Sequence, residues 1–216
     1  MSVTLSVSLG RGRLEALQAD LLVAPFFETD RPLRGAAARA DWRTCGLLSE
    51  QIFAGRVRGA AGEAVLLPSA GRLAADRILA LGLGPRPGFG ARELAAAATL
   101  AGTRAVALRV AVVAMALPVE LHSGIPAALG AVGVLRGFCE ALRRRPAALR
   151  LLLVQGEGEA NAVSLALAEA ASGLSDAQLV VRLEAPRARR KRTEPGVPAG
   201  GRPGGADRQR PAPRPH

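Results

Sequence analysis

One short stretch decides the fold of this chain: Arg77-Ile78-Leu79-Ala80-Leu81-Gly82-Leu83-Gly84. Its apolar run, Ile78 to Leu81, is typical of a strand that is buried on both faces. The glycines end this run, the prolines at 85 and 87 forbid regular structure just after it, and a helical pattern opens near Glu93. The stretch therefore predicts a strand, a glycine-rich turn and a helix, the core of an α/β layer.

The turn after this strand is also a candidate site for an anion. Gly82, Gly84 and Gly88 would let backbone N–H groups approach a phosphate closely, and the N-terminus of the next helix favours negative charge. The spacing completes neither a dinucleotide-binding fingerprint nor a P-loop. The alternative interpretation is a tight turn that binds no ligand.

Strand patterns recur on both sides of the central stretch. Residues 3–9 alternate apolar and polar side chains, which predicts a half-buried strand at a sheet edge. Residues 21–24 predict a second strand, which Asp20 precedes and Pro25 closes. The other strand patterns cover residues 62–68, which should pair with the central strand, and residues 110–116, 149–154 and 178–183, the last at a sheet edge.

Helical patterns alternate with these strands. They cover residues 33–40, 47–53, 93–101, 125–142 and 162–171. Gly102 should cap the third helix. Arg143-Arg144-Arg145 should close the fourth, where cations complement the macrodipole, with a phosphate-binding patch as the alternative. Trp42, between the first two helices, is expected to be a packing anchor, with ligand stacking as the alternative.

The positive charge of the chain is unevenly distributed. The formal net charge is +11 over 216 residues; residues 186–216 hold nine basic residues against two acids, a net +7, which leaves +4 for residues 1–185. Residues 186–216 are rich in Pro, Gly and Arg and contain one large apolar residue, so we predict a disordered basic tail after a single domain at 1–185.

This tail contains a candidate nucleic-acid-binding cluster. Its members are Arg187, Arg189, Arg190, Lys191 and Arg192. Such cations neutralise phosphates, and binding would lack sequence preference because the tail has no aromatic side chain for base stacking. The alternative is a solvated tail whose arginines reflect a GC-rich coding sequence.

The cysteines and the apolar runs indicate in which cellular compartment the protein is expected. Cys45 and Cys139 are far apart and match no zinc or redox spacing, which favours a reduced cytosol. Residues 1–9 do not show the pattern of a signal peptide, and the longest apolar run is too short to span a bilayer. We therefore expect a cytoplasmic protein with no membrane partner.

The order of these motifs resembles the N-terminal domain of the leucyl aminopeptidases of peptidase family M17. The motifs are Asp20-Leu21-Leu22-Val23, Leu33-Arg34-Gly35, Gly55-Arg56-Val57-Arg58-Gly59, Gly62-Glu63 before residues 64–67, and the central stretch itself. The resemblance covers about residues 3–154. It implies a macro-domain-like α/β fold, a three-layer α/β/α sandwich with a mixed, mostly parallel sheet.

The resemblance also implies where the chemistry of the family resides. It lies in a second domain with two metal ions, two active-site lysines and an Asn-Thr-Asp-Ala-Glu-Gly-Arg-Leu signature. This chain lacks the signature, and its only lysine is Lys191, in the tail. No His/Asp/Glu cluster has metal-ligand spacing. Ser69, Ser123 and Ser164 have no visible base partner. We therefore expect no enzyme, no metal and no cofactor.

Three classes of function follow from these observations. The first is a non-catalytic, stand-alone domain with a binding, regulatory or assembly role, acting through a protein partner or self-association. The second is sequence-nonspecific nucleic-acid binding through the basic tail. The third is a macro-like domain that binds a nucleotide or ADP-ribose at the central turn, where no acidic residue is clearly placed for a ribose.

Overall fold

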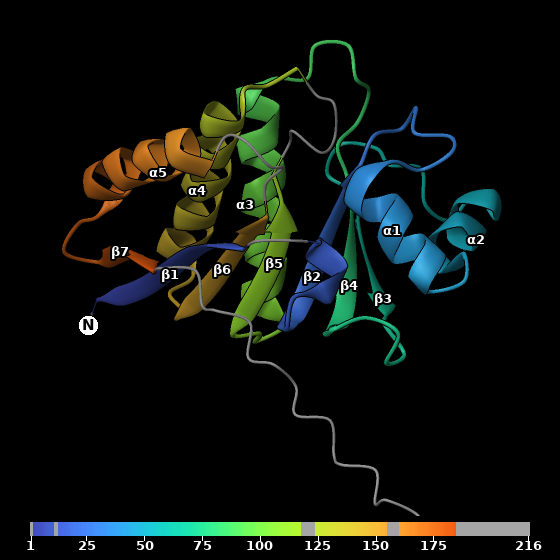
Figure 1. Ribbon diagram of the computed structural model, residues 1–216, viewed down its shortest axis with the longest axis horizontal. Helices are drawn as coiled ribbons and strands as arrows, with labels where there is room; N and C mark the ends of the chain where they lie inside the picture. Colours follow the sequence, from blue (N-terminus) through green and yellow to red (C-terminus); the bar gives the residue numbers. More distant parts are fainter. Residues whose placement is uncertain (1, 11–12, 118–123, 155–159, 185–216) are drawn as a thin grey trace, which may run out of the picture.

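The computed structural model describes residues 2–10, 13–117, 124–154 and 160–184, which form a seven-stranded sheet flanked by helices (Figure 1). The strands lie in the order β3-β4-β2-β5-β6-β1-β7. Their bounds are β1 Val3–Gly10, β2 Ala19–Phe26, β3 Ala64–Pro68, β4 Ala75–Gly82, β5 Val112–Ala116, β6 Leu149–Val154 and β7 Leu179–Glu184. Every neighbouring pair is parallel except β3 and β4, so the predicted mixed, mostly parallel sheet is confirmed.

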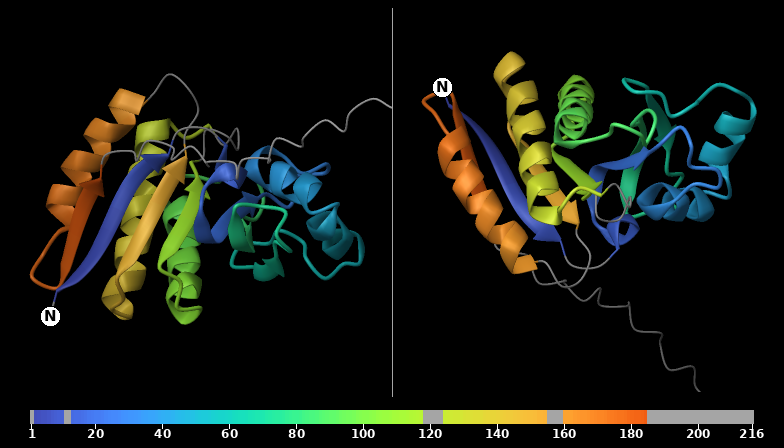
Figure 2. Two further views of the ribbon diagram at one scale, coloured as in Figure 1. Left: turned by 60° about the horizontal axis from the view of Figure 1, so that its bottom comes forward. Right: turned by 90° about the horizontal axis from the view of Figure 1, so that it is seen from above.

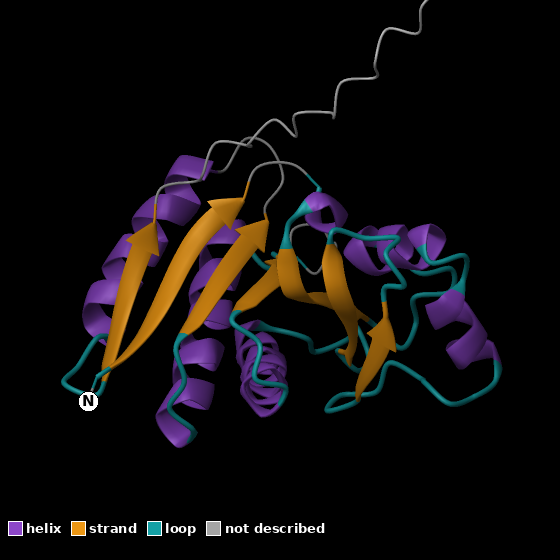
Figure 3. Cartoon of the chain, turned by 90° about the horizontal axis from the view of Figure 1, so that it is seen from below, coloured by secondary structure: helices purple, strands orange, loops and turns teal. Residues whose placement is uncertain are grey.

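Helices cover both faces of this sheet and complete three layers (Figures 2 and 3). One layer consists of α3 (Ala91–Ala107), α4 (Ala127–Arg144) and α5 (Ala160–Leu174), which bury the larger of two apolar cores. The other consists of the 3₁₀ helix η1 (Leu14–Ala16), α1 (Gly35–Arg43) and α2 (Leu47–Phe53), over the second core. Because alternate strand residues point to opposite faces, β2, β4, β5 and β6 contribute to both cores, whereas β1 and β7 contribute to the larger core.

Small side chains let α3 and α4 approach closely. A Cβ atom added at Gly102 would lie 2.8 Å from the Cβ of Ala141, and one at Gly137 would lie 2.5 Å from the carbonyl oxygen of Ala95. Gly102 therefore lies inside α3, where it packs against α4, and its predicted role as a helix cap is wrong. The helix continues because a glycine within an apolar stripe costs less than the contact gains.

Three other predictions about the elements are wrong. Strand β1 lies between β6 and β7 rather than at an edge, because β7 adds a further parallel strand outside it. Strand β2 runs through Pro25 to Phe26, since its pairing with β5 ends at Val23 and the proline lies beyond it. Trp42 is part of α1, which begins and ends later than predicted.

Asp20 shows why an aspartate opens β2. Its carboxylate accepts hydrogen bonds from the backbone N–H groups of Ala111 (2.7 Å) and Val112 (2.9 Å). These two residues lead into β5, so the carboxylate aligns the start of β5 with the start of β2.

Within the described ranges, no helix is both long and apolar enough to cross a membrane. The predicted tail, residues 186–216, lies outside the described residues.

Candidate functional site

The predicted glycine turn connects β4 to α3 and is closely packed. A Cβ atom added at Gly82 would lie 2.1 Å from the carbonyl oxygen of Ala60, so only glycine lets the segment at 59–60 pass here. Gly84 has a left-handed φ of 77° and faces Ala61. Gly88 also has a positive φ, 78°, but faces open space.

Three backbone donors at the start of this turn already have partners. The N–H of Gly82 donates to the carbonyl of Glu63 (2.8 Å), that of Leu83 to Phe26 (3.0 Å), and that of Gly84 to Gly59 (2.8 Å). A phosphate cradle needs N–H groups that point at the ligand. This geometry supports the tight turn, and phosphate binding by Gly82, Gly84 and Gly88 stays a prediction.

A buried ion pair ties the turn to the loop after β2. The carboxylate of Asp30, 1% exposed, accepts hydrogen bonds from Nη2 of Arg86 (2.6 Å) and from the N–H of Phe27 (3.0 Å). The guanidinium of Arg86 also lies 4.3 Å from the ring centroid of Phe27, which meets the ring of Phe89 edge-on at 4.8 Å. Because a buried carboxylate must be paired, this charge fixes the two loops together.

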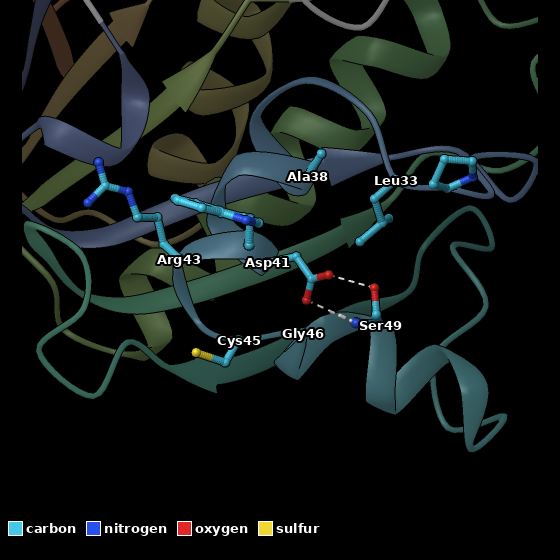
Figure 4. A pocket seen from close by; sticks show the side chains of 9 residues that line it. Leu33, Ala38, Asp41, Arg43, Cys45, Gly46 and Ser49 are labelled. Carbon is cyan, nitrogen blue, oxygen red and sulfur yellow. Dashed lines mark hydrogen bonds between the residues drawn. The ribbon is translucent and has the colours of Figure 1, made fainter.

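A second site, which the sequence did not predict, lies where α1 meets α2 (Figure 4). It is a pocket of about 700 Å³. Its lining residues are Pro32, Leu33, Ala38, Asp41, Trp42, Arg43, Cys45, Gly46 and Ser49. Trp42 is 78% exposed, so its predicted role as a packing anchor is wrong.

The floor of this pocket is held by the carboxylate of Asp41 (Figure 4). Oδ1 accepts the N–H groups of Leu48 (2.7 Å) and Ser49 (3.0 Å), and Oδ2 accepts the hydroxyl of Ser49 (2.5 Å). The carboxylate therefore caps α2 from the end of α1. The turn between the helices uses left-handed residues at Cys45 (φ 58°) and Gly46 (φ 84°), and the Cys45 thiol accepts a hydrogen bond from Arg72.

The exposure of Trp42 could have been predicted from the spacing of residues along α1. Ala36, Ala37 and Ala40 form the buried stripe of α1. Residues two apart on a helix do not share a face, so a helix extended to Arg43 directs Trp42 away from the stripe. The error in the helix boundary therefore caused the error about this side chain.

Among the described residues, Cys139 and Asp176 have shifted pKa values, and both lie away from the pocket and the turn. Burial raises the pKa of Cys139, in α4, to about 11. The hydrogen bond from Arg143 is the main cause that lowers the pKa of Asp176. Arg143 pairs with Asp176 at 2.9 Å and Arg144 with Glu140 at 3.0 Å, so two of the three arginines that close α4 form ion pairs.

Metal-ligating side chains do not cluster in the described part of the chain. There, no group of three or more His, Cys, Asp or Glu side chains could hold a metal ion. The hydroxyl of Ser69 donates a hydrogen bond to the backbone carbonyl of Asp76 (2.8 Å), a contact within the turn between β3 and β4. The predicted basic cluster, Arg187 to Arg192, lies outside the described residues.

Comparison with known proteins gives a family match. The family model described as the N-terminal domain of the cytosol aminopeptidase family matches residues 23–135. A "Probable cytosol aminopeptidase" of Burkholderia orbicola (strain MC0-3) is 34% identical over 118 residues, which are 52% of this chain and 23% of that protein. The chain therefore spans about a quarter of the length of this relative.

Solved structures with the same fold include an aminopeptidase and a macrodomain. A mutant of tomato leucine aminopeptidase superposes with a TM-score of 0.56 and 22% identity, over 79% of this chain and 37% of that one. The Trypanosoma brucei macrodomain, solved in complex with ADP-ribose, superposes with a TM-score of 0.62 and 17% identity, over 74% of this chain and 68% of that one. At these identities the likeness shows the fold alone, and it confirms the macro-domain-like architecture.

Proposed function

The chain belongs to the cytosol aminopeptidase family, whose N-terminal domain it carries, and we propose that it acts as a non-catalytic domain with a binding or assembly role. One observation carries the proposal: the family match covers the N-terminal domain, and no group of three or more His, Cys, Asp or Glu among the described residues could hold a metal ion. The only lysine, Lys191, cannot supply the two active-site lysines that the family resemblance implies.

The state of the two cysteines also indicates a cellular compartment. Both cysteines, Cys45 and Cys139, are free thiols. Free thiols persist in reducing compartments, and we propose the cytoplasm as the site of action.

A peptidase assay tests the non-catalytic part of the proposal. The purified chain, supplied with Mn²⁺ or Zn²⁺, should release no amino acid from a leucine anilide, because the described residues hold no metal-binding cluster and the sequence has one lysine. The Burkholderia orbicola enzyme serves as the positive control. Metal-dependent turnover that follows this chain through a second chromatographic step would contradict the proposal.

Co-expression tests the assembly part. An aminopeptidase chain of the same organism, expressed together with this one, should elute with it in size-exclusion chromatography at micromolar concentration. Separate elution of the two chains would show that no such assembly forms, and the binding role would then require another partner.

ADP-ribose binding has less support as a function. The macrodomain solved with ADP-ribose is 17% identical to this chain. In addition, the N–H groups of Gly82 and Gly84 already donate to backbone carbonyls. The assembly role therefore remains the function that the described residues support best.

A further inference from the structure

Two large aromatic side chains are exposed on the α1–α2 surface, which we define as residues 31–58. Trp42 is 78% exposed and Phe53 is 95% exposed. The chain has only six aromatic residues, and Phe26, Phe27 and Phe138 are fully buried. Exposed aromatic groups that gather in one region mark interaction sites more often than scattered leucines do.

The pocket lies between Trp42 and α2, the helix that ends at Phe53. Trp42 lines it directly, and so does Ser49 of α2. Phe53 follows Ser49 by four residues, so it lies one helical turn further along the same side of α2. Pro32, Leu33 and Ala38 complete an apolar wall. The pocket therefore suits a large apolar side chain, with a second contact available on Phe53.

This surface is positively charged, and two of its arginines have carboxylate neighbours: Arg39 pairs with Glu15 at 3.1 Å and Arg56 lies 4.0 Å from Glu50. It holds six arginines against Asp41 and Glu50, a net charge of +4, whereas the remainder of residues 1–185 has fourteen basic and fourteen acidic residues. Asp41 is engaged in capping α2. Arg34 and Arg43 are exposed, and neither forms an ion pair with a described residue.

We propose that the α1–α2 surface binds an acidic segment of another protein. A large apolar side chain of that segment enters the pocket beside Trp42, and flanking carboxylates contact Arg34 and Arg43. The inference rests on the proposed binding role and names the chemistry of the partner. Apolar anchors in a pocket and opposite charge at its rim are the two features that give such an interface affinity and orientation.

Two other occupants fit the surface less well. A second copy of the chain would bring one +4 surface against another across a two-fold axis, and like charges in register oppose association. A single-stranded nucleic acid needs successive rings for base stacking, whereas here proline, leucine and alanine side chains line the pocket beside one indole.

The sole tryptophan makes the experiment direct, since all indole emission comes from Trp42. The probe is the synthetic peptide Asp-Glu-Asp-Phe-Leu-Glu-Asp-Glu, which contains no tryptophan. Titration into the full chain should shift or quench the emission to saturation. The affinity should fall by about fivefold or more in Phe53→Ser and in the double variant Arg34→Gln, Arg43→Gln, as expected for interface anchors.

Two control variants test whether loss of an exposed apolar side chain, or of an exposed positive charge, outside the α1–α2 surface also weakens binding. Leu165→Ser removes an exposed leucine of α5, and Arg104→Gln removes an exposed charge of α3; both should bind the peptide within about twofold of the unmodified chain, as surface changes outside an interface do. Circular dichroism and melting temperature should be unchanged in Phe53→Ser, because the side chain is exposed. The same peptide with Asn and Gln in place of the acids should bind at least about tenfold more weakly.

Several results would overturn the inference. These are an emission that does not respond to the peptide, equal binding of the neutral peptide, loss of binding in the control variants as well, or an oligonucleotide that displaces the peptide from Trp42. A change in emission on dilution of the chain alone would assign the surface to a second copy. If a co-expressed aminopeptidase chain still associates with Trp42→Ala, the proposed function stands and this surface is not the one used.

Discussion

The two cysteines of the chain differ in their exposure to solvent. Cys45 is exposed in the turn between α1 and α2, while Cys139, in α4, is fully buried in the larger core. Burial disfavours the thiolate and raises the pKa of Cys139 from 9.0 to about 11. Only the thiolate reacts with alkylating reagents. Cys45 should therefore be the reactive thiol of the folded protein.

The raised pKa of Cys139 predicts a loss of stability in alkali. Between pH 9 and 11 the unfolded chain releases this proton and the folded chain keeps it, so the free energy of unfolding is intact below about pH 9 and falls as the pH approaches 11. The loss should be roughly 1–3 kcal/mol, at about 1.4 kcal/mol per pKa unit. Urea unfolding at several pH values measures it.

Few other groups interfere with this measurement, because the chain has no tyrosine and one lysine. Cys139→Ala should flatten the alkaline part of the stability curve, while Cys45→Ser should leave it as it is. A curve that is the same in all three proteins would show that the Cys139 thiol does not cause the loss.

At the scale of elements, the contact between α3 and α4 depends on glycines that a helix would ordinarily disfavour. A Cβ atom at Gly137 would meet the Ala95 carbonyl oxygen at 2.5 Å, the Ala98 Cβ at 2.6 Å and the Thr99 nitrogen at 2.7 Å. Backbone atoms of α3 cannot move aside as the end of a flexible side chain can. At Gly137, helix propensity therefore favours alanine, whereas packing against α3 disfavours it.

Gly137→Ala should lower the free energy of unfolding by about 1–3 kcal/mol, the usual cost of overpacking, although alanine alone favours a helix by about 0.8–1.0 kcal/mol. Gly173→Ala is the matched control, since nothing lies within 4 Å of its added Cβ in α5. It should leave stability unchanged or raise it slightly. Equal effects of the two substitutions in chemical denaturation would contradict the packing argument.

Features that depend on interactions between residues close in sequence could be predicted, whereas features that depend on contacts between distant residues could not. Helix α2 and strand β6 have the bounds that local periodicity and flanking glycine or proline predicted. The position of β1 depends on pairing with β7, almost the whole length of the described chain away, and periodicity carries no information about it. The pocket was missed for a related reason, because it forms only when the Asp41 carboxylate joins two helices.

At the scale of the whole molecule, the sequence predicts a domain followed by a strongly basic end. Residues 186–216 carry +7 of the total +11 and contain one large apolar residue. Such a composition offers little surface for burial. The stability of the domain and its affinity for polyanions should therefore be separable properties.

Removal of residues 185–216 should leave the melting temperature almost unchanged but abolish retention on DNA at low salt. In the intact chain, affinity should fall with a slope of about 0.9 per phosphate neutralised when log affinity is plotted against log salt. Replacement of Arg187, Arg189, Arg190, Lys191 and Arg192 by Ser should reproduce the loss. A melting temperature lower by several degrees would show that the tail stabilises the domain, and unchanged retention would place DNA binding elsewhere.

The place of β1 in the sheet has a consequence for biosynthesis. Leu5 faces Leu149 on one side and Val181 on the other, so β1 leaves the ribosome well before either of its sheet neighbours, β6 and β7. At about 5–20 residues per second, β1 waits roughly seven to thirty seconds for its first neighbour. During that interval its backbone donors and acceptors are open to other chains, and a nascent chain halted before residue 149 exposes a strand that a chaperone must protect.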